Sequence, residues 1–311
     1  MAENYPIQTG AYIVGVDQVA DVWTVLILRE AFAGARRFAD FAARLPISRA
    51  RLTERLKHLL TGGLLERRPY GLSAQRMAYW LTPKGAATYP ILLTLRAWAE
   101  QWRPATGAPL ISGEHGAPLL MRTICRSCGE TVRREDVRWP PLIPLRPGQR
   151  LGGDTNEGVR RWRKMASFDA VSRRPDAALT TLAAFGDRWS MLIMYGAQLG
   201  PFQFSQAQQA LGLAPNILSD RLKHLIDGGL IRRSADHTAA YEGAPAGLAL
   251  FECILAIRSW AIDWETPEGD WAPVTHGPCG ADLLTDQVCV GCGAAARLGA
   301  AQTPTSETAV P

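Results

Sequence analysis

The sequence predicts a mainly α-helical protein with small β-hairpins, an α+β fold built from two tandem copies of one unit. The main observation is an internal repeat. Residues 21–28 (DVWTVLIL) return as residues 187–194 (DRWSMLIM), and residues 55–59 (RLKHL) return unchanged as residues 221–225. Both pairs are 166 positions apart, whereas a later pair of tryptophans recurs after 162 positions. A repeat of this length indicates two similar domains, the second shortened by four residues in the segment that matches 69–78.

Apolar residues of the first copy recur at helical spacing in three consecutive segments. Residues 21–28 predict a first helix, residues 38–45 a second helix that ends before Pro46, and residues 49–60 a third. Ser48 is the expected N-cap of the third helix. Gly62-Gly63 is expected to end that helix, because glycine readily adopts the left-handed conformation found after helix ends.

The remainder of the copy alternates like a hairpin and then returns to a helix. Residues 64–68 and 77–81 predict two strands around a polar loop, and Thr82-Pro83 begins an amphipathic helix from about residue 84 to 102. This order of elements is that of a winged helix-turn-helix, whose third helix enters a DNA major groove while the hairpin lies along the backbone. The predicted DNA-binding residues are Ser48, Arg49, Arg51, Thr53, Arg55, Lys57, Arg67, Arg68 and Arg76 in the first copy, and Asn216, Ser219, Arg221, Lys223, Arg232 and Arg233 in the second.

The order of these motifs resembles the HxlR family of bacterial transcription regulators. The similarity rests on DVWTVLILRE from Asp21, RFADF from Arg37, LTERLK from Leu52, GLLERRPY from Gly63 and YWLTPKG from Tyr79. The second copy resembles the family through GDRWSMLI, PNILSDRLK and GLIRR. The resemblance implies a winged-helix fold related to the MarR group, binding of double-stranded DNA as a two-fold dimer, and control of transcription. Tandem copies would then form a pseudo-dimer within one chain, and further homo-oligomerisation stays open.

Three departures from the family distinguish the copies. Many members carry an oxidant-sensing cysteine thirteen residues before the tryptophan of the first helix, where this chain has Gly10 and Asp176. The wing arginine at Arg76 becomes Thr238, and the LTPKG motif is replaced by GAPAG in the second copy. Residues 1–105 contain 14 Lys and Arg against 8 Asp and Glu, whereas residues 166–311 contain 9 against 15. The first copy is therefore the expected DNA reader, and the alternative is a second copy that mediates dimerisation or docks on a protein partner.

Each winged unit is followed by a Cys-x-x-Cys-Gly motif, at Cys125 and Cys128 in the first copy and at Cys289 and Cys292 in the second. Ten residues before each motif stands another candidate ligand followed by glycine, His115 and Cys279 respectively, and His276 adds a fourth ligand near the second motif. Four Cys and His ligands suit a closed structural zinc site. The sequence therefore predicts a short zinc-ribbon-like knuckle after each copy, complete in the second (His276, Cys279, Cys289 and Cys292) and lacking an obvious fourth ligand in the first. Reduced, metal-free cysteines are the alternative.

The predicted boundaries are residues 1–105 for the first winged unit, 106–137 for the first knuckle, 138–168 for a linker with a basic run at 160–164, 169–266 for the second winged unit, 267–298 for the second knuckle, and 299–311 for a disordered tail. We expect a cytoplasmic protein without a membrane segment, since no signal peptide is recognisable. No catalytic motif is recognisable, and we expect no enzyme activity. The tryptophans of the last helices (Trp98, Trp102, Trp260 and Trp264) belong to the core, to an interface, or to a pocket for a small-molecule effector.

Overall fold

The computed structural model describes residues 10–70, 73–102, 111–112, 115–116, 119–140, 187–235, 239–265, 273–296 and 301–302. The predicted linker from residue 141 onward, its basic run, and Thr238 lie outside these ranges. Most of the predicted tail also lies outside them, but residues 301–302 form a short strand rather than part of a disordered segment.

The first copy begins with a helix that the sequence patterns did not reveal, α1 (Gly10–Val19). Then come α2 (Val22–Phe32), α3 (Phe38–Arg44), α4 (Arg49–Thr61), the antiparallel hairpin β1 (Leu65–Tyr70) with β2 (Ser73–Leu81), α5 (Pro83–Ala86) and α6 (Tyr89–Trp102). The last predicted helix is therefore divided in two. Pro90 has no N–H to donate to the carbonyl of Ala86, but the matching helix of the second copy is divided at the same place with Glu252 instead of a proline, so the division does not depend on Pro90.

The second copy repeats this order from α2 onward in its described part. It contains α10 (Arg188–Leu199), β6 (Phe202–Gln203), α11 (Phe204–Leu211), α12 (Pro215–Asp227), β7 (Ile231–Arg233), β8 (Ala240–Gly243), α13 (Pro245–Leu248) and α14 (Phe251–Trp264). Its strands form a sheet in the order β6-β8-β7. The predicted succession of helix, helix, helix, hairpin and helix is thus present in both copies.

Helices α4 and α12, the third helix of the winged unit in each copy, end in the same way. After α4, Gly63 adopts φ 68°, its N–H donates to Leu60 O, and the N–H of Leu64 donates to Leu59 O. In the matching bonds after α12, the N–H groups of Gly229 and Leu230 donate to the carbonyls of Ile226 and Leu225. These bonds satisfy carbonyls that the helix leaves unpaired, and the positive φ explains why glycine is retained in both copies.

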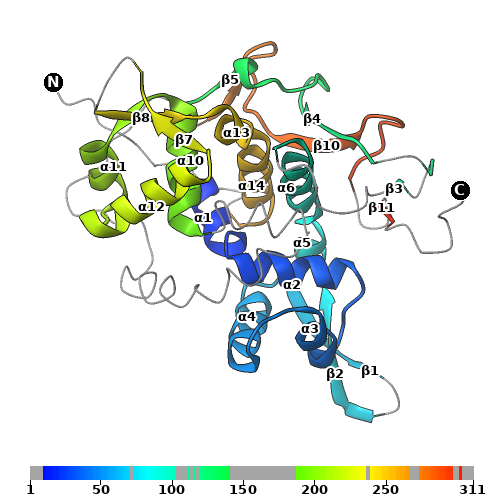
Figure 1. Ribbon diagram of the computed structural model, residues 1–311. Coiled ribbons are helices and arrows are strands. Elements are labelled where there is room, and N and C mark those ends of the chain that lie inside the picture. The colour runs from blue at the N-terminus through cyan, green and yellow to red at the C-terminus, as the bar shows by residue number, and fades with distance from the viewer. Residues whose placement is uncertain are drawn as a thin grey trace, which may run out of the picture.

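The two copies share one continuous hydrophobic core, and helices near their boundary pack against each other. Helix α14 lies against α1 and α6 of the first copy at the centre of the molecule (Figure 1). The approach of α1 is close enough that a Cβ on Gly15 would come within 2.7 Å of the Ile257 side chain. The indole N–H of Trp98 donates to Ala246 O (2.7 Å), and that of Trp260 donates to Lys84 O (3.1 Å). Because these residues correspond pairwise at an offset of 162, the two bonds are equivalent under exchange of the copies.

The segments after the winged units pair across the copies. Strand β4 (Met121–Cys125) pairs with β10 (Thr285–Cys289), β5 (Val137–Arg138) with β9 (Thr275–His276), and β3 (Ile111–Ser112) with β11 (Ala301–Gln302). In the first pair Thr123 stands opposite Gln287, and these two residues correspond at an offset of 164. Exchange of the copies therefore maps this pairing onto itself, which is the signature of an isologous, two-fold contact.

Among the described residues, one helical stretch, Pro245–Trp264 (α13 with α14), is long and apolar enough to cross a membrane. A bent pair of helices (Ala11–Val19 with Val22–Phe32) passes the same test as one span. In the structure, 78% of the tested window of Pro245–Trp264 is buried inside the protein, as in the core helix of a folded domain.

Candidate nucleic-acid interface and metal centres

Helix α4 presents the surface that the sequence predicts for DNA reading. Ser48 caps the helix as predicted, because its side chain accepts the N–H of Arg51. Ser48, Arg49, Thr53 and Lys57 are exposed, and Arg51 is half-buried. The Arg49 guanidinium lies over the Phe38 ring at 5.8 Å from its centroid, so the first residue of α3 packs against this arginine.

Two of the predicted DNA-binding arginines are buried instead. Arg55 and Arg221 are 5% and 3% exposed, and their Nε atoms lie 3.4 and 3.3 Å from the carboxylates of Asp21 and Asp187. These two aspartates also cap α2 and α10 by accepting two backbone N–H groups each. The prediction is corrected for both arginines, because a guanidinium held inside this ion pair ties the recognition helix to the helix behind it and cannot reach a phosphate.

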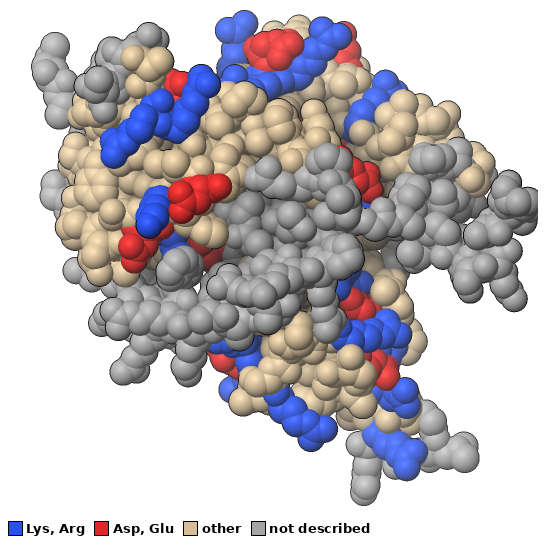
Figure 2. All heavy atoms as spheres, viewed as in Figure 1, with Lys and Arg blue, Asp and Glu red and all other residues tan. Residues whose placement is uncertain are grey.

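The wing of the first copy carries exposed positive charge. Arg67, Arg68 and Arg76 are all exposed on the β1–β2 hairpin. The Arg67 and Arg68 guanidinium groups lie over the rings of Tyr79 and Trp80, and Arg68 also forms an ion pair with Glu66. Lys and Arg spheres gather over the part of the molecule formed by α3, α4 and this hairpin (Figure 2).

The second copy presents a weaker positive surface. Asn216, Ser219 and Lys223 are exposed on α12, where Asp220 and Asp227 are exposed as well. In its hairpin, Arg232 and Arg233 are exposed. The Arg232 Nε lies 2.7 Å from the Glu242 carboxylate, and the Arg233 guanidinium lies 4.1 Å from the centroid of the Tyr241 ring. Arg232 is thus paired with a carboxylate, as Arg68 is in the first copy, and α12 adds two exposed acidic side chains.

The structure brings the predicted metal ligands together, but in sets that combine the two copies. The first cluster consists of Cys125 and Cys128 from the first knuckle with His276 and Cys279 from the second. The second cluster consists of His115 from the first knuckle with Cys289 and Cys292 from the second. The predicted grouping of His276 and Cys279 with Cys289 and Cys292 is therefore wrong. The cross-copy pairing of β4 with β10 and of β5 with β9 carries each ligand to the other copy's Cys-x-x-Cys.

The spacing of the first cluster fits one tetrahedral metal ion. Zn–S and Zn–N bonds of about 2.3 and 2.05 Å imply S···S and S···N separations of about 3.8 and 3.6 Å. The Cys125 and Cys279 Sγ atoms are 3.9 Å apart, and His276 Nδ1 lies 3.4 Å from the Sγ atoms of both Cys128 and Cys279. Burial raises the pKa of the Cys125 thiol, but hydrogen bonds from the backbone N–H groups of Cys128 and Ser127 outweigh it and lower that pKa overall.

The second cluster is less complete among the described residues. His115 Nε2 lies 3.1 Å from Cys289 Sγ, and the three ligand atoms lie within 4.8 Å of one another. The hydrogen bond with His115 is the main cause that lowers the pKa of the Cys289 thiol to about 7. Cys253 belongs to neither cluster. It is 2% exposed, and burial raises the pKa of its thiol to about 12, which confirms its predicted place in the core.

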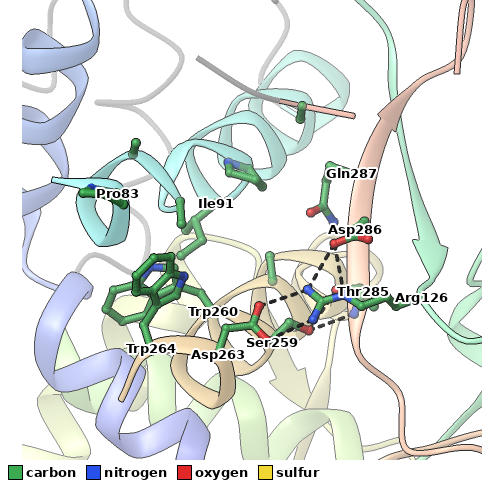
Figure 3. Close-up of a pocket in the computed structure, with 15 residues that line it drawn as sticks. Pro83, Ile91, Arg126, Ser259, Trp260, Asp263, Trp264, Thr285, Asp286 and Gln287 are labelled. Carbon is green, nitrogen blue, oxygen red and sulfur yellow. Dashed lines mark hydrogen bonds and ion pairs between the residues drawn. The ribbon is translucent and has the colours of Figure 1, made fainter. Parts of the chain in front are cut away.

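A cavity of about 580 Å³ opens between the copies, bounded by α5, α6, α14 and β10 (Figure 3). Trp260 and Trp264 line one end of it, whereas Trp98 and Trp102 do not contribute to its walls. At the other end, Arg126 donates to Asp263 and Asp286 at distances from 2.9 to 3.2 Å. Two carboxylates around one guanidinium leave this end with a net negative charge.

Comparison with known proteins agrees with the internal repeat of the sequence. The model of the HxlR-like helix-turn-helix family matches residues 18–106 and 184–269, more than half of the chain. The chain belongs to the HxlR-like helix-turn-helix family. The two matches cover the two winged units, and the knuckles lie mostly outside them.

Individual relatives match less than half of this chain. An uncharacterized HTH-type transcriptional regulator from Mycobacterium tuberculosis is 37% identical over 132 residues, covering 40% of this chain and 82% of that protein. The HTH-type transcriptional regulator YodB from Bacillus subtilis is 33% identical over 81 residues, 26% of this chain and 72% of that protein. The solved structure of PA1607 is 30% identical and covers 40% of this chain and 89% of its own, with a TM-score of 0.37.

Proposed function

We propose that this chain is a sequence-specific, DNA-binding transcription regulator of the cytoplasm in which the two copies act as a pseudo-dimer. The observation that carries the proposal is the exposed α4 face with its basic hairpin, set within a family whose relatives are HTH-type transcriptional regulators. Helix α4 offers Arg49 and Lys57 to a major groove, and the wing offers Arg67 and Arg76 to the adjacent backbone.

The pseudo-two-fold contacts between the copies support binding to a two-part site. In Figure 1, α4 and α12 lie away from the β4–β10 pair. The hairpins β1–β2 and β7–β8 lie on the outer side of their own winged units. A two-fold helix-turn-helix reader binds half-sites about one helical turn apart. Because the second copy differs from the first at many surface positions, we propose an operator with two unequal half-sites.

The first copy is proposed to dominate affinity, and matched double substitutions test this. Arg49→Ala with Arg76→Ala removes two exposed cations from the first copy, and Lys223→Ala with Arg232→Ala removes two from the second. Operators selected from a random DNA library provide the probe for fluorescence anisotropy. The first pair is expected to weaken binding by more than tenfold relative to the second pair, since Arg232 is already neutralised by Glu242. Equal losses would overturn the dominance of the first copy.

Salt dependence separates DNA binding from the alternative of a protein-interaction module. Each phosphate contact changes the slope of log affinity against log salt by about 0.9. Six to eight contacts are expected to give a slope of about −5 to −7, reduced by about one for each removed phosphate-binding arginine. A flat response of nucleic-acid affinity to salt would favour docking on a protein partner.

We also propose that the first cluster holds a structural zinc ion. Its four ligands come from both knuckles and show the spacing of a tetrahedral site. The ion would fix the β4–β10 pair and thereby the two copies relative to each other, and no chemical reaction is assigned to it. Elemental analysis of protein purified without chelator is expected to give at least one equivalent of zinc. Less than a tenth of an equivalent would contradict the assignment.

The cavity between the copies supports a small-molecule effector site as a second candidate. Two tryptophans at one end and two carboxylates at the other favour a cationic, aromatic ligand. Screening such compounds by quenching of tryptophan fluorescence, with Trp264→Ala as the comparison, tests this site. Quenching that is the same in the variant would place binding elsewhere.

A further inference from the structure

The two metal clusters are related by the same pseudo-two-fold symmetry as the rest of the molecule, yet they are not equivalent. Cys279 of the first cluster corresponds to His115 of the second at an offset of 164. At the same offset the position of His276 is occupied by Ser112. A serine hydroxyl does not replace an imidazole as a zinc ligand. The first cluster therefore has four Cys and His ligands, and the second has three in the part of the chain that the structure describes.

Burial does not separate the two clusters. In the first cluster Cys125 and His276 are fully buried, whereas Cys128 and Cys279 are exposed. In the second cluster Cys289 is buried, and both His115 and Cys292 are exposed. Water and competing ligands thus reach two ligands of each cluster, and the difference between the clusters lies in the number of protein ligands. Closed four-ligand zinc sites are structural, whereas sites with three protein ligands keep a position for an exchangeable ligand.

The apolar supports behind the clusters correspond to each other. The first cluster is backed by a buried group that joins α14 to both knuckles, consisting of Cys125, Val132, Val137, Phe251, Leu255, Val274 and Leu283. Among the described residues on the other side, Tyr89, Leu93 and Ala296 form a buried group, and they match Phe251, Leu255 and Val132 under exchange of the copies. The last helix of a winged unit therefore lies behind each cluster.

The second cluster is also linked to the DNA-reading unit of the first copy. Ala296 lies four residues after Cys292 and packs in the same buried group as Tyr89 of α6. The Tyr89 ring contacts the ring of Phe32, the last residue of α2, at a centroid distance of 4.8 Å. An ion that draws His115 and Cys292 together would therefore press the second knuckle against the helix that supports α4 of the first copy.

We propose that the second cluster is an exchangeable regulatory site for a zinc-class divalent cation. The first cluster keeps its ion permanently, and occupation of the second cluster seats the second knuckle on the first winged unit and tightens DNA binding. The metal site itself stands on the ligand geometry alone. The regulatory effect rests on the proposed DNA-binding function.

Metal release from the full-length protein tests the site. Protein loaded with Zn²⁺ alone is mixed with a chelating dye, and the time course of zinc transfer is recorded. Two equivalents are expected, one leaving at least tenfold faster than the other. Cys292→Ser is expected to abolish the fast phase and keep the slow one, and the buried Cys253→Ala variant serves as the matched cysteine control with both phases intact. A single equivalent in the wild type, two phases of equal rate, or loss of the slow phase in Cys292→Ser would each overturn the proposal.

The regulatory effect is measured by anisotropy with a labelled operator, using protein that holds one or two equivalents of Zn²⁺. The two-equivalent form is expected to bind at least fivefold more tightly, within the usual range of coupling between two sites. Cys292→Ser is expected to bind as the one-equivalent form does, with or without added zinc. Equal affinity of both forms would overturn regulation while leaving the metal site intact. Absence of DNA binding by either form would refute the proposed function and regulation together, and the release kinetics would still decide the metal site.

Discussion

Substitution of Arg55, the buried arginine of α4, is expected to lower the stability of the protein without removing a contact with DNA. Arg55 and Arg49 are six positions apart on α4, one with a buried side chain in an ion pair with Asp21 and the other exposed. Truncating one partner of a fully buried ion pair costs about 3–5 kcal/mol. Asp21 is 31% exposed and keeps two backbone N–H donors, so the residual carboxylate is partly satisfied after Arg55→Ala. We expect a loss of about 2–3 kcal/mol in the free energy of unfolding, equivalent to a fall in Tm of about 3–5 °C for a chain of this length.

The matched variant Arg49→Ala is expected to show the opposite pattern. Removing an exposed side chain changes stability by about 0.5 kcal/mol or less, whereas loss of a base or phosphate contact weakens DNA binding by about 1–3 kcal/mol. Thermal unfolding and operator binding at a temperature where both variants are fully folded are the two measurements. Arg55→Ala should then bind within about twofold of the wild type. An Arg55→Ala variant with unchanged Tm and an affinity as low as that of Arg49→Ala would refute the reasoning.

Further predictions concern the packing between elements. Gly85→Ala and Gly247→Ala would each place a methyl group 2.0 Å from a backbone carbonyl oxygen, so each is expected to destabilise the protein by about 3 kcal/mol or more in chemical denaturation; a change below 1 kcal/mol would contradict the close approach. Trp98→Phe and Trp260→Phe each remove an N–H that donates across the boundary between the copies, and similar losses of about 2 kcal/mol are expected for both, whereas very unequal losses would argue against the pseudo-symmetry. Burial raises the pKa of Cys253 to about 12, so the thiol stays protonated in the folded protein. In the unfolded chain the same thiol ionises above about pH 8.5. The contribution of Cys253 to stability is therefore lost as the pH rises. Iodoacetamide at pH 8 should accordingly leave Cys253 unmodified in the folded protein, and rapid labelling detected by peptide mass spectrometry would show that it is accessible.

Local patterns were sufficient to predict the winged units. The third helix, its cap at Ser48 and its end at Gly63 depend on residues within a few positions of one another, and the structure confirms all three. Helix α1 escaped prediction although Tyr12, Val16 and Val19 follow a helical spacing. Gly15 is a poor helix former and interrupts this pattern. Glycine is needed at this position because side chains of α14, more than 240 positions away in the sequence, leave no room for a Cβ.

The role of Arg55 was readable in principle. It lies beside Leu59 on the helical wheel, at the edge of the buried face formed by Leu52, Leu56 and Leu59. Its counterpart Arg221 is retained in the copy that lost much of its other positive charge, together with the aspartate that each arginine pairs with. Retention of both partners in two diverged copies of one chain indicates an ion pair rather than a contact with DNA.

The grouping of the metal ligands was not readable from spacing. The interval of ten residues before each Cys-x-x-Cys is the same whether the chain folds back on its own motif or crosses to the other copy. The choice is made by the pairing of β4 with β10, two strands that are separated by about half of the chain. Cross-copy pairing depends on burial of Phe251 and Leu255 of α14 against the first knuckle, a long-range contact without a local sequence signal.

Because the two copies are joined in one chain, the two metal clusters can change independently, which a homodimer of single units would not allow. In a homodimer, a change from histidine to serine at one ligand position would remove that ligand from both clusters at once. In the tandem chain the same change at Ser112 affects one cluster, and His276 completes the other. The same independence applies to the DNA-reading surfaces, because the acidic residues on α12 have no counterpart at the matching positions of α4 apart from Glu54. Fusion of two copies therefore permits one half to hold the assembly together while the other half reads DNA. Either copy expressed alone would retain no complete ligand set, since each cluster takes its ligands from both.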